Sequence, residues 1–275
     1  MQRYSVFVPN RCTSEKNMKK FALFFCFLLL GLSAAAQGER SHETYLYAKR
    51  DTCDLYLDIF RPKEGSETTF NGKAKPTVVF VFGGGFIMGE RVDDFTLQWF
   101  KRLNENGYTL VTIDYRLGMK GQKVGKGLIG AYKASGLFCE SQRIGVEDLF
   151  SAIKFLSVNS EELGIDADNL VVSGSSAGAI ISQAAEYDIL CGRTGVLPKG
   201  FQFKGVMAFA GAIISNEGAP KYPAAPCPTL LLHGTADKTV AYNKFGAFGH
   251  GIWGSDWLVR QWSKQGWNNY CIYRF

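Results

Sequence analysis

Residues 170–178 read Leu170-Val171-Val172-Ser173-Gly174-Ser175-Ser176-Ala177-Gly178, and this is the most informative stretch of the chain. The strand Leu170–Val172 runs directly into a serine with a glycine two positions away on each side. The helix Ala179–Ala185 is expected to follow. A strand that turns sharply into a helix has no room for side chains at the two glycine positions. The stretch therefore predicts a strand–turn–helix unit with Ser176 at its apex.

That placement gives Ser176 the setting of a nucleophile. Its Oγ would project above the sheet near a helix N-terminus, where partial positive charge favours a developing anion. The alternative is a glycine-rich turn that only permits close packing.

A glycine triplet supplies the second signal. The continuous apolar run Thr77–Phe82 predicts a buried parallel strand, and Gly83-Gly84-Gly85 follows it. Backbone N–H groups without side chains in the way can stabilise the oxyanion of acyl transfer, and one such donor contributes about 3–4 kcal/mol. We expect the donors to be Gly84, Gly85 and Ala177. A phosphate-binding loop would need Lys-Ser/Thr after the glycines, and none follows.

Asp237 supplies the third signal. It follows the predicted strand Thr229–His233, and it comes after Ser176 in the chain. Its predicted role is to orient a histidine and stabilise the imidazolium. The alternative for Asp237 is a turn or helix-cap residue. His233 lies at the strand end, and we interpret it as structural.

The remaining pattern alternates strands with helices, which predicts an α/β fold with a mostly parallel central sheet and helices on both faces. Asp94 is a candidate N-cap for the helix Phe95–Asn104. Leu117–Gly136 has little periodicity and reads as a solvated loop near the site, with contact to acidic sugars as an alternative for Lys120, Lys123 and Lys126. A helix is expected at Val146–Leu156, and early strands at Tyr45–Tyr47 and Leu55–Phe60.

Together with Asp114-Tyr115-Arg116-Leu117, these motifs resemble the α/β-hydrolase superfamily, in its carboxylesterase and lipase branch with a glycine-triplet oxyanion loop. The resemblance covers Tyr45 to the C-terminus. It implies an α/β-hydrolase fold and serine-dependent hydrolysis of carboxylic esters, with no cofactor and no metal. One departure is Phe82, where the family usually has a histidine of mostly structural role.

The general base is missing from its expected place. The resemblance puts this histidine after the last sheet strand, which here is Asn269–Phe275. We therefore expect the domain to be incomplete at the C-terminus, with the histidine shortly after Phe275 and little activity in this chain. His250, in what reads as a flexible insertion, is a weaker candidate, and His42 weaker still.

The N-terminal residues have the pattern of a targeting segment that is not part of the folded domain. A basic start, Met18-Lys19-Lys20, precedes the apolar run Phe21–Leu32 and small residues up to Ala36. This is the pattern of a secretory signal peptide. We expect 1–17 to be a mis-assigned start, 18–36 a leader cleaved near Ala36 for export, and 37–275 one domain without stable membrane insertion.

Charge and cysteine usage exclude several classes of partner and cofactor. The first 36 residues hold five of the 31 basic residues and one of the 25 acidic residues, which leaves 26 and 24, a net charge of +2. This near-neutral body gives no reason to expect nucleic-acid binding. The five remaining cysteines contain no Cys-x-x-Cys pair, so zinc and redox motifs are absent.

The expected substrate is therefore a small-molecule or polysaccharide-linked ester, and members of this kind resemble acetyl or feruloyl esterases acting on plant polysaccharide. One alternative is a serine peptidase of the prolyl-oligopeptidase type, for which a propeller domain has no room. The other is a non-catalytic α/β-hydrolase-like binding protein that lacks the base. Oligomeric state is not predicted.

Overall fold

The computed structural model describes residues 42–247 and 249–275, so the predicted start and leader lie outside the described residues. Residues 42–275 form one compact unit. Its elements, in chain order, are β1 Glu43–Lys49, β2 Asp54–Phe60, β3 Thr69–Phe70, β4 Lys73–Ala74, β5 Thr77–Val81, α2 Asp94–Glu105, β6 Leu110–Ile113, α3 Gly127–Val158, α4 Ser160–Leu163, β7 Leu170–Ser175, α5 Ala177–Leu190, β8 Gly205–Phe209, β9 Ala212–Ser215, β10 Thr229–His233, β11 Lys244–Ala247, β12 His250–Gly254, α6 Ser255–Lys264 and β13 Tyr270–Arg274.

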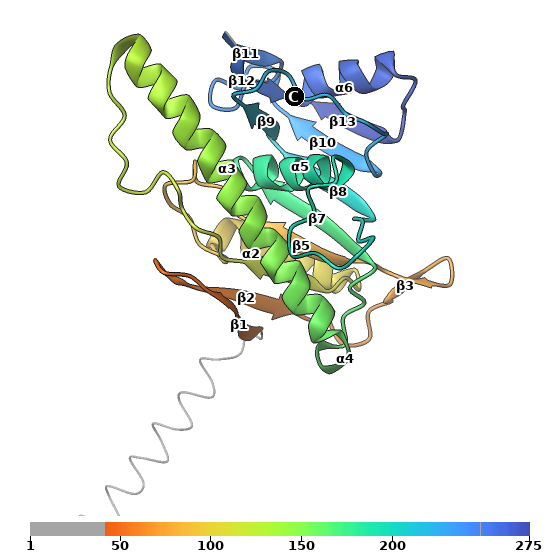
Figure 1. Cartoon of the computed structure of the whole chain (residues 1–275). Coiled ribbons are helices and arrows are strands. Elements are labelled where there is room, and N and C mark those ends of the chain that lie inside the picture. Colours follow the sequence, from red (N-terminus) through yellow and green to blue (C-terminus); the bar gives the residue numbers. More distant parts are fainter. Residues whose placement is uncertain (1–41, 248) are drawn as a thin grey trace, which may run out of the picture. The chain divides into compact units, whose positions relative to one another are not determined.

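Eight strands form the central sheet in the order β1-β2-β6-β5-β7-β8-β10-β13 (Figure 1). The two contacts of β2, with β1 and with β6, are antiparallel, and all other neighbours are parallel. The predicted mostly parallel sheet is confirmed. Because β5, β7 and β10 are parallel, their carboxyl ends meet at the same edge, where ligands bind in open α/β sheets.

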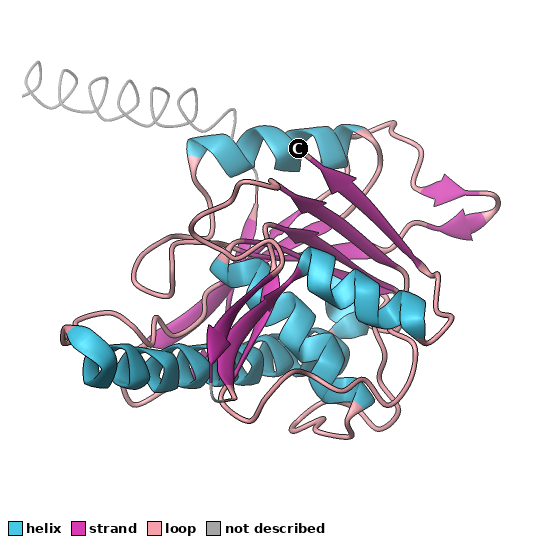
Figure 2. Ribbon diagram, turned by 90° about the horizontal axis from the view of Figure 1, so that it is seen from above, coloured by secondary structure: helices cyan, strands magenta, loops and turns pink. Residues whose placement is uncertain are grey.

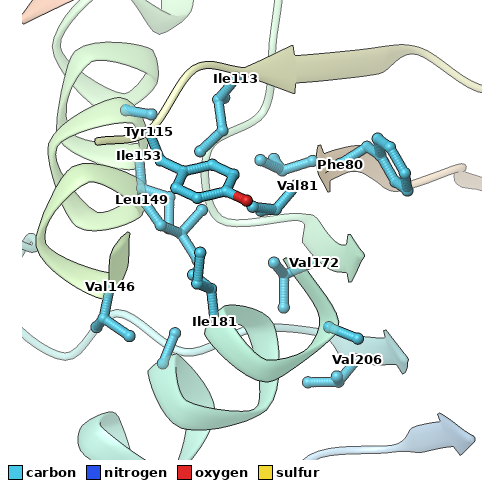
Figure 3. Close-up of a cluster of buried hydrophobic side chains, with 14 of the residues drawn as sticks. Phe80, Val81, Ile113, Tyr115, Val146, Leu149, Ile153, Val172, Ile181 and Val206 are labelled. Atoms are coloured by element: carbon cyan, nitrogen blue, oxygen red, sulfur yellow. The ribbon is translucent and has the colours of Figure 1, made fainter. Parts of the chain in front are cut away.

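Helices cover both faces of this sheet, as predicted. Figure 2 shows α2 on one side and α3, α5 and α6 on the other. Successive side chains along β5 point to opposite faces of the sheet, so the strand contacts helices on both sides. The Phe80 ring lies 5.3 Å from the rings of both Trp99 and Phe100 on α2. Val81 points to the opposite face, into the cluster beneath α3 and α5 (Figure 3).

That cluster is the main core (Figure 3). Leu149 and Ile153 of α3 and Ile181 of α5 are completely buried against the sheet. Continuous apolar strands are typical of a sheet that is buried on both faces. The core thereby fixes β7 and α5, the two elements that meet at Ser176.

Two predictions about local structure are wrong. The segment Leu117–Gly136 is not a loop throughout, because α3 begins at Gly127. The segment around His250 is a strand, since β11, β12 and β9 form a separate antiparallel sheet. Cross-strand pairing of β12 with the buried strand β9 orders this insertion.

A third correction concerns the start of α2. The N-cap is Asp93, whose Oδ1 accepts a hydrogen bond from the Thr96 amide at 2.7 Å. Thr96 Oγ1 in turn accepts from the Asp93 amide at 3.2 Å, which completes a capping box. Asp94 is therefore the first helical residue rather than the cap.

Candidate active site

Ser176 lies at the turn between β7 and α5, as predicted. Its backbone angles are φ 51° and ψ −116°, and few non-glycine residues adopt a positive φ. Such a conformation costs about 1–3 kcal/mol and persists only when the surroundings enforce it. Here the Ser176 amide donates to the Phe209 carbonyl at 2.8 Å, which ties the turn to the end of β8. The side chain is half-buried and sits at the helix N-terminus.

Gly174 and Gly178, on either side of this serine, lie so close to other backbone atoms that neither position has room for a side chain. A Cβ on Gly174 would lie 2.4 Å from the Gly178 carbonyl carbon and oxygen. A Cβ on Gly178 would lie 1.9 Å from the Val81 carbonyl oxygen. Glycine at both positions therefore lets α5 pack directly on β7 and β5.

The glycine triplet lies against the serine. A Cβ on Gly83 would be 3.3 Å from Ser176 Cβ, so the loop that leaves β5 touches the predicted nucleophile. Gly84 and Gly85 have φ of 113° and 64°, in the region that favours glycine. Within the described residues, the amides of Gly84, Gly85 and Ala177 donate no hydrogen bond. Ser176 is therefore followed by one free amide, that of Ala177, and the loop that touches it carries two more, those of Gly84 and Gly85.

Tyr115 supports this loop, a role that the sequence analysis did not assign to it. Its hydroxyl donates to the Phe82 carbonyl at 3.1 Å, and its ring lies 4.5 Å from the Phe82 ring. Burial raises the pKa of the Tyr115 phenol well above its ordinary value, so the group stays a neutral donor. The only feature of the sequence that pointed to Tyr115 was its place in the motif Asp114-Tyr115-Arg116-Leu117, which follows β6.

Asp237 lies in the turn after β10, two strands from Ser176 along the same edge. Its Oδ1 accepts from the amides of Thr239 at 2.7 Å and Val240 at 3.0 Å. Its Oδ2 lies 3.5 Å from His233 Nε2, and a fifth of the side chain is exposed. The carboxylate therefore caps its own turn while keeping one oxygen partly open. Within the part of the chain that the structure describes, no hydrogen bond or ion pair joins it to Ser176.

His233 is buried and bonded through both ring nitrogens. Nδ1 lies 2.9 Å from Ser255 Oγ, and Nε2 lies 3.1 Å from the Val240 carbonyl. The ring therefore pins the start of α6 to the end of β10, in keeping with the structural interpretation.

The other two described histidines contact neither Ser176 nor Asp237. His250 Nδ1 lies 3.3 Å from Ser135 Oγ on α3, and His42 Nε2 lies 3.8 Å from Asp58 Oδ1 on β2. Among the described residues, the structure thus brings Ser176 and the glycine triplet together and places no histidine in contact with either Ser176 or Asp237. The same residues offer no cluster of His, Cys, Asp and Glu suited to a metal ion. Nor do they include a helix long and apolar enough to cross a membrane.

Several curated proteins are similar to part of this chain. Esterase E4 of Myzus persicae is 28% identical over 125 residues, which are 46% of this chain and 20% of that protein. Para-nitrobenzyl esterase of Bacillus subtilis is 29% identical over 137 residues, 50% of this chain and 25% of that protein. The aligned part of the chain thus spans only about a fifth to a quarter of the length of these relatives.

Solved structures with the same fold cover more of the chain. Esterase 2 of Thermogutta terrifontis, phosphonylated by cyclosarin, superposes with a TM-score of 0.58 at 22% identity, covering 86% of this chain and 83% of that one. Its apo form gives a TM-score of 0.57 at 21% identity, with 87% and 85% covered. These likenesses confirm the α/β-hydrolase fold. The model of the carboxylesterase family matches residues 32–185, more than half of the chain, and the chain therefore belongs to the carboxylesterase family.

Proposed function

We propose that the complete protein is a serine carboxylic-ester hydrolase. Ser176 Oγ attacks the ester carbonyl and forms an acyl-enzyme, and the amides of Gly84, Gly85 and Ala177 stabilise the oxyanion. Water then releases the acid. The observation that carries this proposal is the strained Ser176 turn in contact with a loop whose amides are free.

The base in this mechanism is a histidine oriented by Asp237. Its predicted position after Phe275 lies outside the sequence and stays a prediction. The geometry of β13 supports it, because the Phe275 amide donates to the His233 carbonyl at 3.2 Å and the Thr235 amide donates to the Phe275 carbonyl at 2.8 Å. Position 275 therefore lies beside the turn that carries Asp237.

The finer substrate class is part of the same proposal. The leader pattern of residues 18–36 supports export, and exported enzymes of this kind meet polysaccharide-linked esters. Acetyl or feruloyl esters of plant polysaccharide are therefore the substrates to compare with simple alkyl esters.

A fluorophosphonate probe tests the nucleophile in the complete protein, taken from the full reading frame. Labelling and hydrolysis of p-nitrophenyl acetate should both be lost in Ser176→Ala, because the acyl-enzyme cannot form. Ser157→Ala, a change on the outer part of α3, should retain both. Hydrolysis that survives Ser176→Ala would contradict the mechanism. Absence of labelling in the folded, complete wild type would favour the non-catalytic binding protein.

Asp237→Asn and His250→Asn separate the partners of Ser176. Loss of the orienting carboxylate should lower kcat by about 10⁴. His250→Asn should leave kcat close to wild type, since His250 contacts Ser135 and Tyr132 of α3. A large loss in His250→Asn alone would instead identify His250 as the base.

A further inference from the structure

The first turns of α3 carry apolar side chains that face water. Leu128, Ile129 and Tyr132 are 91%, 75% and 65% exposed. Their spacing of three and four residues places them on one side of the helix. Gly130, between them, is buried against the preceding loop. Soluble proteins seldom expose several large apolar side chains together unless the surface has a partner.

The same segment is strongly basic. Lys120, Lys123, Lys126 and Lys133 are all exposed, and no Asp or Glu occurs between Met119 and Glu140. None of the four ammonium groups has an ion pair or side-chain hydrogen bond with any residue that the structure describes. We call residues 120–133 the α3 arm. A basic amphipathic segment of this kind is typical of binding to a membrane surface.

The neighbouring hairpin extends the arm. The His250 ring lies 4.8 Å from the Tyr132 ring, and Figure 1 shows β11 and β12 beside the first turns of α3. Ala247 pairs with His250 and Phe245 with Ile252, so Phe245 shares the face of the hairpin that holds His250. Phe245 is 76% exposed. Its ring therefore adds apolar surface next to the arm.

Both ends of the arm are fixed to the oxyanion loop. Before the arm, the Met119 amide donates to the Phe86 carbonyl at 3.0 Å. After it, the Phe138 ring lies 6.4 Å from the Phe86 ring. Phe86 directly follows Gly85. A surface that binds the arm thus lies at a fixed place relative to Ser176.

We propose that the α3 arm and Phe245 form a docking surface for an anionic lipid bilayer. The apolar side chains enter the headgroup boundary while the lysines pair with lipid phosphates. A second copy of the chain fits this surface less well, because a symmetric dimer contact would place the same lysines opposite one another and their charges would repel. This binding does not depend on the proposed ester hydrolysis.

Vesicle sedimentation tests the proposal with the full chain in a Ser176→Ala background, which prevents turnover. The protein should bind vesicles containing a third phosphatidylglycerol far more than pure phosphatidylcholine, and added salt should weaken the binding. Lys123→Gln, Lys126→Gln and Lys133→Gln together should lower the partition coefficient on the order of a hundredfold, since each lysine contributes about fivefold. Leu128→Ser with Ile129→Ser should lower it about tenfold.

The matched control lies at the other end of the same helix. Lys154→Gln with Val158→Ser removes one exposed lysine and one apolar side chain that is 74% exposed, and should leave binding unchanged. Failure to bind anionic vesicles, or equal binding by the arm variants and the control, would overturn the proposal. A gel-filtration dimer that the arm variants dissolve, without any change in lipid binding, would also overturn it and assign the surface to self-association.

Discussion

Single atoms decide the geometry around Ser176. The Gly178 Cα approaches the Val81 carbonyl so closely that one added methyl group would lie 1.9 Å from that oxygen. This close approach holds the N-terminus of α5 against the end of β5, next to the Phe82 carbonyl that precedes the glycine triplet. The sequence predicted this requirement from spacing alone, since the pentapeptide permits no side chain at either end.

Gly178→Ala should therefore destabilise the fold by about 2–4 kcal/mol, because backbone must move to admit the methyl group. Urea unfolding followed by circular dichroism measures the change. Gly136→Ala on α3 is the matched control, as nothing lies within 4 Å of its added Cβ. Helix propensity predicts that this control gains up to about 1 kcal/mol. Equal stabilities for the two variants would refute the packing argument.

At the scale of elements, a buried carboxylate joins β6, α3 and the β1–β2 turn. Asp148 is completely buried. Its Oδ2 accepts from Arg116 Nε and from the Arg116 amide, both at 2.9 Å, and its Oδ1 accepts from Arg50 Nε at 3.0 Å. Each arginine keeps about a quarter of its side chain exposed. Asp148 thus fixes where the chain leaves β6 toward the loop that contains Gly83–Gly85 and Phe86.

Asp148→Ala should cost about 3–5 kcal/mol, because it removes the buried carboxylate that two arginines and the Arg116 amide share. Glu147→Ala on the same helix provides the control. Glu147 is nearly half exposed and pairs with Arg116 and Arg143 at the surface, so its loss should cost under about 1 kcal/mol. Thermal unfolding of both variants measures the difference, and similar melting temperatures would contradict the assignment.

Glu186 of α5 gives a pH dependence with a defined sign. Burial raises its pKa above the ordinary value of 4.5, although its Oε1 accepts from the Cys227 amide at 2.9 Å. The folded state thus holds this proton more tightly than the unfolded state, so the contribution of Glu186 to stability is fully present below pH 4.5 and is lost as pH rises through the folded pKa. Glu186→Gln should remove that part of the fall, whereas the exposed Glu105→Gln should keep it. Melting temperatures across this range test the sign.

Some helices and strands could be predicted from the sequence and others could not. The predicted strands Thr77–Phe82 and Leu170–Val172 correspond to β5 and to the first half of β7, because their apolar runs reflect burial on both faces of the sheet. The first turns of α3 were missed because three glycines and several lysines hide the helical period, and the helix there depends on tertiary contacts such as Phe138 with Phe86. The strand at His250 was missed because its short hairpin with β11 depends on pairing with β9, which lies far away in the sequence.

At the scale of the whole molecule, the two faces of the sheet are covered unequally. On the α2 side, Trp99 reaches the Phe209 ring of β8 at 5.7 Å. Farther along, Leu230 pairs with Cys271 and Leu232 with Tyr273, so these four side chains share that face. Tyr273 is 56% exposed. The described residues therefore leave an apolar face open at β10 and β13, the last strand of the sheet order.

An open face on a terminal strand favours association between chains. The 275-residue chain should therefore self-associate as its concentration rises, which light scattering after gel filtration measures. Tyr273→Lys with Phe275→Lys should lower the apparent mass, because two charges oppose both stacking of the apolar face and strand pairing. Phe70→Lys, at a side chain 70% exposed on the distant β3–β4 hairpin, should leave association unchanged. If the unsubstituted chain and both variants stay monomeric at high concentration, the open face does not cause association. If only Phe70→Lys is monomeric, association occurs through the β3–β4 hairpin instead.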